Sequence, residues 1–283
     1  MPKLTNSRLR EPSTCQTPFR KAHTVSQDIL YEFHDGVGRI TFNRPEARNA
    51  LTFRMYERLG EILQQAESES SVKALILTGA GDKAFAAGTD ISEFKAFSGP
   101  EDALGYEARM DRILDALERS RIPTIAAIAG ACTGGGATIA ACCDIRIGAP
   151  NARFGVPIGR TLGNCLSISN YVRLVSLIGP ARVKDIIFTG RLIDAAEAHA
   201  IGLLSEVLPD HASLQSRASE LARTVASQAP LTLRATKEAL RRINENIGPK
   251  EDRDLILMCY MSRDFREGMD AFLNKRAPKW TGT

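Results

Sequence analysis

Apolar and polar positions alternate near the start of the chain and then take up helical spacing. Asp35-Gly36 separates two short runs in which every second residue is apolar (Ile29, Tyr31 and Phe33; then Ile40 and Phe42). Alternation on both sides of an Asp-Gly pair predicts a β-hairpin. Thr52 is suited to cap a following helix, whose apolar residues share one face (Met55, Leu59, Ile62, Leu63 and Ala66). The pattern predicts two strands and then a helix.

Two later apolar runs are long enough to form buried strands (Leu75–Thr78 and Thr124–Ala129), and Ile145–Ile147 is predicted to form another strand. The first is followed by a loop over Gly79–Asp90, a polar segment over Glu93–Glu107, and a helix around Met110–Leu117. The second leads through three glycines into another helix. Strands and helices that alternate in this way predict an α/β fold, whose units can stack into a spiral.

From about Ser213 to its end the chain is predicted to be helical. Apolar residues recur there at helical spacing (Leu233, Leu240, Ile243 and Ile247, then Leu255, Ile256, Cys259 and Phe265). We therefore divide the 283 residues into a basic N-terminal arm (1–25), a core (26–212) and a helical C-terminal region (213–283).

Composition is typical of a soluble globular protein, with 43% hydrophobic and 25% charged residues. No stretch reaches the roughly 18 unbroken apolar residues that predict a membrane span. The net charge is +4, but residues 1–25 hold five basic residues and one acidic residue, which leaves 32 of each sign elsewhere. The body is therefore neutral, and its charge does not favour nucleic-acid binding. RNA binding through the basic arm is an alternative that deletion of the arm would test.

The six cysteines lack C-x-x-C spacing (Cys15, Cys132, Cys142, Cys143, Cys165 and Cys259). A zinc site needs paired ligands, and none of the four histidines lies near these cysteines in the sequence. We predict free thiols in a reducing cytoplasm, and no bound metal.

Two glycine-bearing segments, Phe85–Asp90 and Gly134–Gly136, carry the strongest chemical signal. Each follows a predicted buried strand and leads toward a predicted helix. One backbone N–H from each segment could point at the oxygen of a thioester carbonyl as that oxygen gains charge. Glycine lets the backbone approach a substrate closely, and a helix that begins at Gly135 would add the positive end of its dipole. The two segments together predict an oxyanion hole.

Five motifs follow one another along the chain: Asn43–Leu51 (N-R-P-x-x-x-N-A-L), Ala86–Ile91 (A-G-x-D-[IL]), Ile122–Gly130, the glycine triplet with Cys143-Asp144, and Asp264–Lys279 (E-G-x-x-A-F-x-x-K-R-x-P). In order and spacing they resemble the enoyl-CoA hydratase/isomerase family, the crotonase superfamily. The resemblance runs from about Asp28 to Trp280. It implies a crotonase-like ββα superhelix as the core, and oxyanion-hole N–H groups at Thr89 and Gly135.

The resemblance also implies partners. The C-terminal helices would assemble a homotrimer or a dimer of trimers, the alternative being a helical cap on the same subunit's core. Six residues would contact an acyl-CoA thioester (Arg48 and Ala50 near the nucleotide, Ala87, Asp90 and Ile91 along the pantetheine, and Lys275 at a phosphate). The alternative for Lys275 is an ordinary surface lysine. CoA is part of the substrate, so no separate cofactor is predicted.

The chain departs from the family at both catalytic positions. Hydratases of the family hold a water between two glutamates, one three residues after the middle glycine of the triplet and one after F-G-x-P. Thr138 and Ile158 stand at these positions. Isoleucine transfers no proton, and threonine is too weak a base at neutral pH. Hydration by the usual route is therefore not expected, and isomerisation that relies on the second glutamate is doubtful.

Polar residues follow Ile158 where the family is usually glycine-rich. Arg160 could bind a second carboxylate on the acyl group, or pair with an acidic neighbour at the surface. Cys165 could be a nucleophile or an acid, or a small buried thiol. Glu107 and Asp111 could supply a relocated carboxylate, or belong to the solvated face of their helix.

Three functions remain open. The first is acyl-CoA chemistry other than hydration, such as decarboxylation of a malonyl-type thioester, which needs an oxyanion hole and an apolar wall more than it needs a base. The second is a hydratase or isomerase with its carboxylate relocated to residues 93–111. The third is a non-catalytic acyl-CoA binder.

Overall fold

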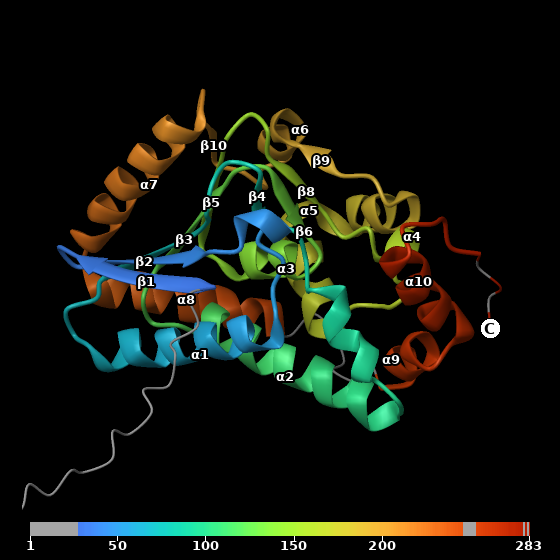
Figure 1. Cartoon of the computed structure of the whole chain (residues 1–283). Helices are drawn as coiled ribbons and strands as arrows, with labels where there is room; N and C mark the ends of the chain where they lie inside the picture. The colour runs from blue at the N-terminus through green and yellow to red at the C-terminus, as the bar shows by residue number, and fades with distance from the viewer. Residues whose placement is uncertain (1–27, 246–252, 280, 282) are drawn as a thin grey trace, which may run out of the picture.

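The computed structural model describes residues 28–245, 253–279, 281 and 283. The predicted N-terminal arm and Ile247 lie outside these residues. Two sheets and the helices around them form the body, and the last two helices (Arg253–Tyr260 and Arg263–Leu273) lie together at one side of it (Figure 1).

The larger sheet has six strands in the order β1 (Ile29–His34), β2 (Val37–Phe42), β3 (Ala74–Gly79), β5 (Thr124–Ile128), β7 (Ile145–Gly148) and β10 (Glu206–Val207). Strands β1 and β2 are antiparallel, and the other pairs are parallel. The predicted hairpin is confirmed. Its turn residues Asp35 and Gly36 have φ of 49° and 80°, as a two-residue turn of this kind requires.

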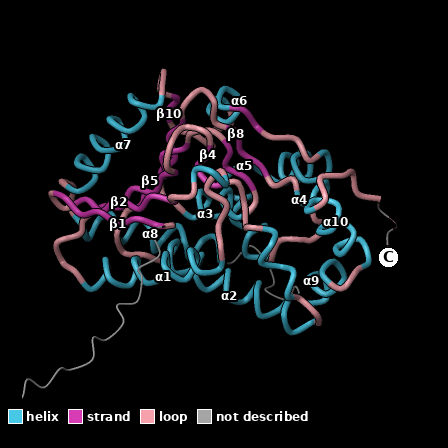
Figure 2. Tube along the Cα trace, viewed as in Figure 1, coloured by secondary structure: helices cyan, strands magenta, loops and turns pink. Residues whose placement is uncertain are grey.

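The smaller sheet has four strands in the order β4 (Ala84–Ala86), β6 (Ala131–Thr133), β8 (Arg153–Gly155) and β9 (Ile193–Asp194). Three successive strand pairs, β3 with β4, β5 with β6, and β7 with β8, place one strand in each sheet before the chain enters a helix (Figure 2). This repetition forms the spiral of ββα units that was predicted.

Helical segments connect and cover the sheets: η1 (Pro45–Ala47), α1 (Phe53–Ser68), η2 (Ile91–Ala96), α2 (Pro100–Glu118), α3 (Gly135–Cys142), α4 (Ile158–Thr161), α5 (Ile168–Thr189), α6 (Ala195–Ala200), α7 (His211–Ala226), α8 (Pro230–Glu245), α9 (Arg253–Tyr260) and α10 (Arg263–Leu273). Helix α1 begins as predicted, because the Thr52 hydroxyl accepts a hydrogen bond from the Met55 amide. Its predicted apolar face is buried.

Helix α2 begins earlier than the sequence pattern indicated. We expected a polar segment up to Glu107 and a helix only around Met110, whereas the helix begins at Pro100. The Asp102 carboxylate accepts hydrogen bonds from the amides of Ser98 and Gly99, which fixes the first turn. Much of the segment read as polar is therefore the N-terminal half of a packed helix.

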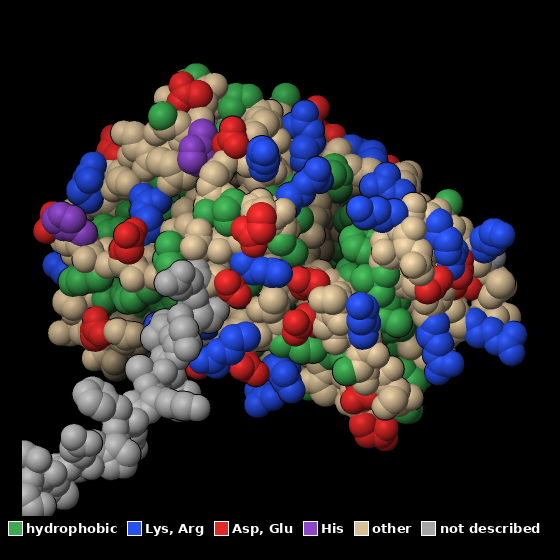
Figure 3. All heavy atoms as spheres, in the orientation of Figure 1, with side chains coloured by type: hydrophobic (Ala, Val, Ile, Leu, Met, Phe, Trp, Pro, Cys, Tyr) green, Lys and Arg blue, Asp and Glu red, His purple; other side chains and the backbone are tan. Residues whose placement is uncertain are grey.

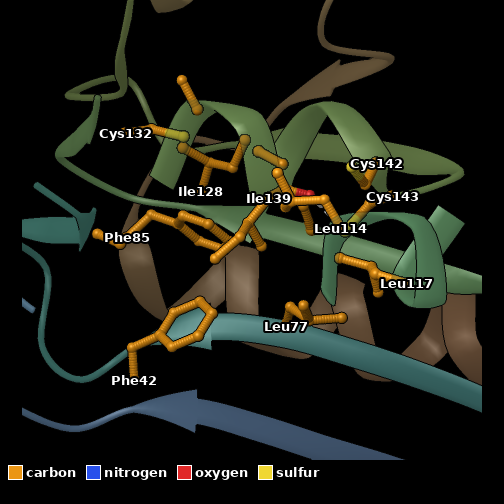
Figure 4. Close-up of a cluster of buried hydrophobic side chains, with 14 of the residues drawn as sticks. Phe42, Leu77, Phe85, Leu114, Leu117, Ile128, Cys132, Ile139, Cys142 and Cys143 are labelled. Carbon is orange, nitrogen blue, oxygen red and sulfur yellow. Dashed lines mark hydrogen bonds between the residues drawn. The ribbon is translucent and has the colours of Figure 1, made fainter. Parts of the chain in front are cut away.

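The main core lies between the sheets and helices α1 to α3. It gathers fully buried side chains from several elements (Phe42, Leu77, Phe85, Leu114, Leu117 and Ile139; Figure 4). Because α3 is apolar on nearly all sides, it can pass through this core and hold its first residue at a fixed place.

Helix α7 covers the outer face of the larger sheet. Leu214, Ala218 and Ala222 pack on Ile76 and Ile125 in a second buried cluster. The packing of the core thus continues through α7, beyond the predicted boundary at residue 213.

The last three helices differ in how they pack. Helices α9 and α10 pack on η2 and α2 in a third cluster that contains Phe94, Tyr260 and Phe265. Helix α8 leaves Leu240 and Ile243 57% and 62% exposed. A cap on the same subunit's core therefore describes α9 and α10, but not this face of α8.

Among the described helices, none is both long and apolar enough to cross a membrane.

Candidate active site

A pocket of about 550 Å³ is lined by both glycine-bearing segments and by α2 and α4. Figure 3 shows this side of the molecule hollowed between the core and the C-terminal helices, with hydrophobic side chains inside and Lys and Arg side chains around. A pocket of this size can enclose the acyl end of a substrate.

The two glycine-bearing segments touch each other in this pocket. Gly88 and Gly134 both have positive φ, at 96° and 50°, and a Cβ on Gly134 would lie 3.5 Å from the Gly88 Cα. A Cβ on Gly136 would lie only 2.1 Å from the Ala86 carbonyl oxygen. Glycine is required here because the backbones of β4 and α3 pack directly on one another.

Two backbone amides at this junction have no acceptor among the described residues. The Leu51 amide donates to the Gly88 carbonyl, and the Asp90 amide donates to the Leu51 carbonyl. Neither of these hydrogen bonds uses the Thr89 amide, which lies between them in the chain. Gly135 is the first residue of α3. Within the described part of the chain, the Thr89 and Gly135 amides donate to no acceptor. A Cβ on Gly135 would lie 3.2 Å from the Thr89 hydroxyl, which places the two residues side by side.

Helix α3 is anchored at its opposite end by Arg146. This buried guanidinium donates to the carbonyls of Ala140 and Cys143, at the end of α3, and to that of Leu203. A cation at a helix C-terminus stabilises the helix dipole. Arg146 thus helps to fix the helix whose first amide faces the pocket.

The two positions where glutamates were expected contain no carboxylate and line the pocket. The Thr138 side chain is buried, and its hydroxyl donates to the Gly135 carbonyl at 2.9 Å. Ile158 is buried at the start of α4. The wall here is therefore apolar, apart from a hydroxyl that is engaged by its own helix.

Three hydroxyl groups form a chain beside Gly135. The Tyr56 hydroxyl lies 2.9 Å from the Thr89 hydroxyl, which lies 3.1 Å from the Tyr106 hydroxyl. Burial raises the pKa of both tyrosines, so both remain protonated at neutral pH. Neither tyrosine was singled out in the sequence, although Tyr56 lies next to Met55 on the packed side of α1.

The reading of Glu107 as a solvated residue is wrong. Glu107 is only 6% exposed, lines the pocket, and accepts a hydrogen bond from the Tyr260 hydroxyl at 2.5 Å. The Tyr260 hydroxyl in turn accepts from the Asn164 amide nitrogen at 3.2 Å. Asp111, one turn along α2, instead accepts from the Ser167 hydroxyl at 2.7 Å.

The family model for enoyl-CoA hydratase/isomerase matches residues 32–283. The chain belongs to this family. The short-chain-enoyl-CoA hydratase of Clostridium acetobutylicum is 36% identical over 258 residues, which covers 88% of this chain and 95% of that protein. The fold of the family is the crotonase fold, and the two sheets and their helices agree with it.

Solved structures of the family superpose over nearly the whole chain. An enoyl-CoA hydratase/isomerase from Pseudoalteromonas atlantica has a TM-score of 0.79 at 28% identity, covering 90% of this chain and all of that one. A methylmalonyl-CoA decarboxylase in complex with 2-nitronate-propionyl-CoA has a TM-score of 0.82 at 29% identity, covering 91% and 99%. The chain is thus similar to family members named for different reactions.

Five of the six residues expected to contact an acyl-CoA line this same pocket (Arg48, Ala50, Ala87, Asp90 and Ile91). Lys275 does not line it and is an exposed residue just after α10. The Asp90 carboxylate is engaged within the chain, since it caps η2 and forms an ion pair with Arg44 at 3.0 Å.

Arg160 lines the pocket from α4 and is exposed. Within the residues that the structure describes, its guanidinium has no acidic partner, and its stem packs near Gly190. The alternative of a surface ion pair for Arg160 thus has no support in the described structure. Arg160 remains a candidate to bind an anion on a substrate of the family.

The described cysteines form two groups, with Cys15 outside the described residues. Cys132, Cys142 and Cys143 are buried and free, and burial raises their pKa. Cys165 and Cys259 are half-buried, and a hydrogen bond from Cys165 lowers the pKa of Cys259 to about 7. No cluster of three or more metal-ligating side chains occurs among the described residues.

We expect Cys259 to be alkylated by iodoacetamide with a pH midpoint near 7, because the thiolate is the reactive form. The rate should rise as pH increases through this value. A Cys165→Ala variant should move the midpoint up toward about 8.5, the ordinary value for a thiol. Peptide mass spectrometry of native protein labelled at several pH values measures this. A wild-type midpoint already at the ordinary value would contradict the proposed thiol pair.

Proposed function

We propose that this family member stabilises the enolate of an acyl-CoA thioester in an oxyanion hole formed by the amides of Thr89 and Gly135. The observation that carries the proposal is that these two adjacent amides donate to no described acceptor where the pocket meets the start of α3. A helix N-terminus stabilises negative charge, and preorganised donors do so most effectively where charge develops.

We further propose that the reaction is not hydration by a pair of glutamates. Thr138 and Ile158 occupy the two expected positions, and the Thr138 hydroxyl is already hydrogen-bonded to Gly135. Activation of water needs a base whose pKa lies near the working pH. Relatives such as the Clostridium protein are named hydratases, so hydration is the reaction against which the proposal must be tested.

Decarboxylation of a malonyl-type thioester is the reaction that this wall favours. The bond from Cα to the carboxylate breaks, carbon dioxide leaves, and the electron pair passes to the thioester oxygen in the hole; Cα then takes a proton. An apolar residue such as Ile158 favours loss of the charged carboxylate group. Arg160 lines the pocket and would bind the carboxylate of the substrate there. The similarity to a methylmalonyl-CoA decarboxylase supports this reaction.

A second candidate is an isomerase or hydratase that uses a relocated carboxylate. The buried position of Glu107 on the pocket favours it. Isomerisation needs a single group that removes a proton at one carbon and returns it at another, so one carboxylate can suffice.

A mass-spectrometric substrate panel separates these functions. We expect loss of carbon dioxide from malonyl-, methylmalonyl- or ethylmalonyl-CoA, and no gain of water on crotonyl-CoA. A Gly135→Pro variant lacks the amide donor and should lose the activity by at least about 100-fold.

Each other outcome has a defined meaning. Rapid hydration of crotonyl-CoA would refute the argument from Thr138 and Ile158. Conversion of a 3-enoyl-CoA to its 2-enoyl isomer would favour the second candidate. If every thioester bound but returned unchanged, the protein would be a non-catalytic acyl-CoA binder.

We propose a homotrimer or a dimer of trimers as the assembly. The exposed Leu240 and Ile243 on α8 form an apolar face that a neighbouring subunit would cover. Lys275 would then contact a phosphate of the CoA that is bound to a neighbouring subunit. We propose the cytoplasm as the location of the protein. Light scattering after size exclusion would measure the mass.

A further inference from the structure

We infer that Glu107 transfers the proton at Cα of the bound thioester, and that Tyr260 and Asn164 position its carboxylate. This inference rests on the proposed enolate chemistry. It assigns a proton donor and acceptor to a site whose two expected glutamates are replaced, and it implies a second activity, exchange of the Cα hydrogen of a saturated acyl-CoA with solvent.

Glu107 is distinguished by its surroundings. Among the described residues that line the pocket, the acidic side chains are Asp90 and Glu107. Asp90 forms an ion pair with Arg44 and accepts from the Ser92 amide, so its carboxylate has a structural role at the start of η2. Glu107 is buried, lines the pocket and accepts a hydrogen bond from the Tyr260 hydroxyl. A carboxylate that is buried at the wall of a pocket is a candidate for proton transfer.

Tyr260 and Asn164 hold this carboxylate from two other elements. Tyr260, the last residue of α9, donates to Glu107 Oε1, and Asn164, in the segment after α4, donates to the Tyr260 hydroxyl. Burial and the nearby Glu107 charge both raise the pKa of Tyr260 well above its usual value. Tyr260 therefore stays protonated and remains a hydrogen-bond donor to Glu107 across the working pH range.

The Glu107 carboxylate and the oxyanion hole belong to one connected arrangement. Tyr106, the preceding residue on α2, places its hydroxyl 3.1 Å from the Thr89 hydroxyl. Glu107 is also close enough to raise the pKa of Tyr56, although burial is the larger cause of that shift. Tyr56 lies against Gly135. A thioester whose oxygen lies between the two amides would therefore present its Cα within the same enclosed space as Glu107.

The protons balance in both reactions, decarboxylation and Cα hydrogen exchange. After decarboxylation, protonated Glu107 gives its proton to Cα, the C–O π bond of the thioester re-forms, and the carboxylate regains a proton from water. With a saturated acyl-CoA, the carboxylate removes a Cα proton, the C–H electron pair moves to the thioester oxygen, and the acid returns a solvent-derived hydrogen. No oxidant or metal is needed.

Deuterium exchange into propionyl-CoA tests the inference. Wild-type protein in D₂O should add deuterium at Cα, measured by mass spectrometry, and Glu107→Gln should exchange at least about 100 times more slowly. Asp111→Asn is the matched control, because it removes a carboxylate one turn along α2 from the Ser167 contact. It should exchange at the wild-type rate, within about threefold.

Additional variants separate proton transfer from a structural role. Glu107→Asp keeps a carboxylate but shortens the side chain by one methylene, which moves the carboxylate away from the substrate. Exchange by this variant should therefore fall to an intermediate rate, and this result can be obtained even if Glu107→Gln proves unstable. Tyr260→Phe should slow exchange about tenfold and shift its pH profile, because the hydrogen bond that stabilises the ionised carboxylate is lost. Circular dichroism would confirm that each variant is folded.

The outcomes distinguish the two proposals. Equal exchange by wild type and folded Glu107→Gln would overturn the assignment of Glu107 and leave the oxyanion hole intact. Decarboxylation by the wild type without any Cα exchange would also overturn it. If the wild type neither exchanged nor decarboxylated any thioester, the enolate proposal itself would fail.

Discussion

A Gly135→Ala variant is expected to turn over its thioester substrate about 100 to 1000 times more slowly than the wild type, with little change in KM. The added Cβ would lie 2.0 Å from the Tyr56 hydroxyl and 3.2 Å from the Thr89 hydroxyl. The start of α3 or the Tyr56 side chain must therefore move. A displacement of about 1 Å is enough to misplace the amide that meets the developing negative charge.

Gly105→Ala provides the control for this experiment. Gly105 also lies in a helix, α2, and a Cβ there would meet no atom within 4 Å. Alanine is the better helix former, so this variant should keep full activity and at least wild-type stability. A folded Gly135→Ala protein that retained more than about a third of the wild-type kcat would contradict the oxyanion-hole proposal.

Replacement of Arg146 by methionine is expected to lower the free energy of unfolding by about 3 kcal/mol. Methionine retains the apolar bulk but leaves the buried carbonyls of Ala140, Cys143 and Leu203 without their donor. It also removes the cation that stabilises the C-terminus of α3. Urea unfolding at a fixed protein concentration would measure the change.

Arg153→Met is the matched control for Arg146→Met. Arg153 also donates to a backbone carbonyl, that of Ala152 at 2.8 Å, but its side chain is exposed, so water can replace it. Its replacement should change stability by no more than about 0.5 kcal/mol. A loss of less than about 1 kcal/mol for Arg146→Met would show that these buried carbonyls find other partners.

The pocket combines the scaffold of the family with side chains that carry no carboxylate at positions 138 and 158. The backbone features that build the proposed oxyanion hole are set by close packing of β4 on α3, which tolerates no side chain at Gly136. Thr138 and Ile158, by contrast, line the pocket and are not part of the close contact between Gly136 and Ala86. The family name alone therefore does not fix the reaction of this chain.

Local patterns in the sequence determined much of the fold. Period-two alternation around Asp35-Gly36 predicted the first hairpin, and Thr52 with the apolar spacing after it predicted α1. Such features depend on turn geometry, capping and a single buried face, all of which lie within about 15 residues of chain. The five ordered motifs predicted the spiral of ββα units.

The sequence pattern misplaces Glu107 because it predicts too late a start for α2. Ala103, Glu107 and Met110 lie on the same buried face of α2 as Leu114 and Leu117. An extension of that spacing back to the Asp102 cap would have placed Glu107 on the inside. The charge of the side chain predicts exposure to solvent, whereas its position in the helical repeat predicts burial, and the structure agrees with the position.

Only the tertiary structure decided which residues meet at the pocket. Tyr56, Tyr106, Asn164 and Tyr260 come from α1, α2, the segment after α4, and α9, and the sequence contains no local signal that they converge. The sequence determined the two glycine segments and the replacement of both expected glutamates, because these are features of single positions. Contacts between helices depend instead on how distant faces pack, which helical periodicity alone does not specify.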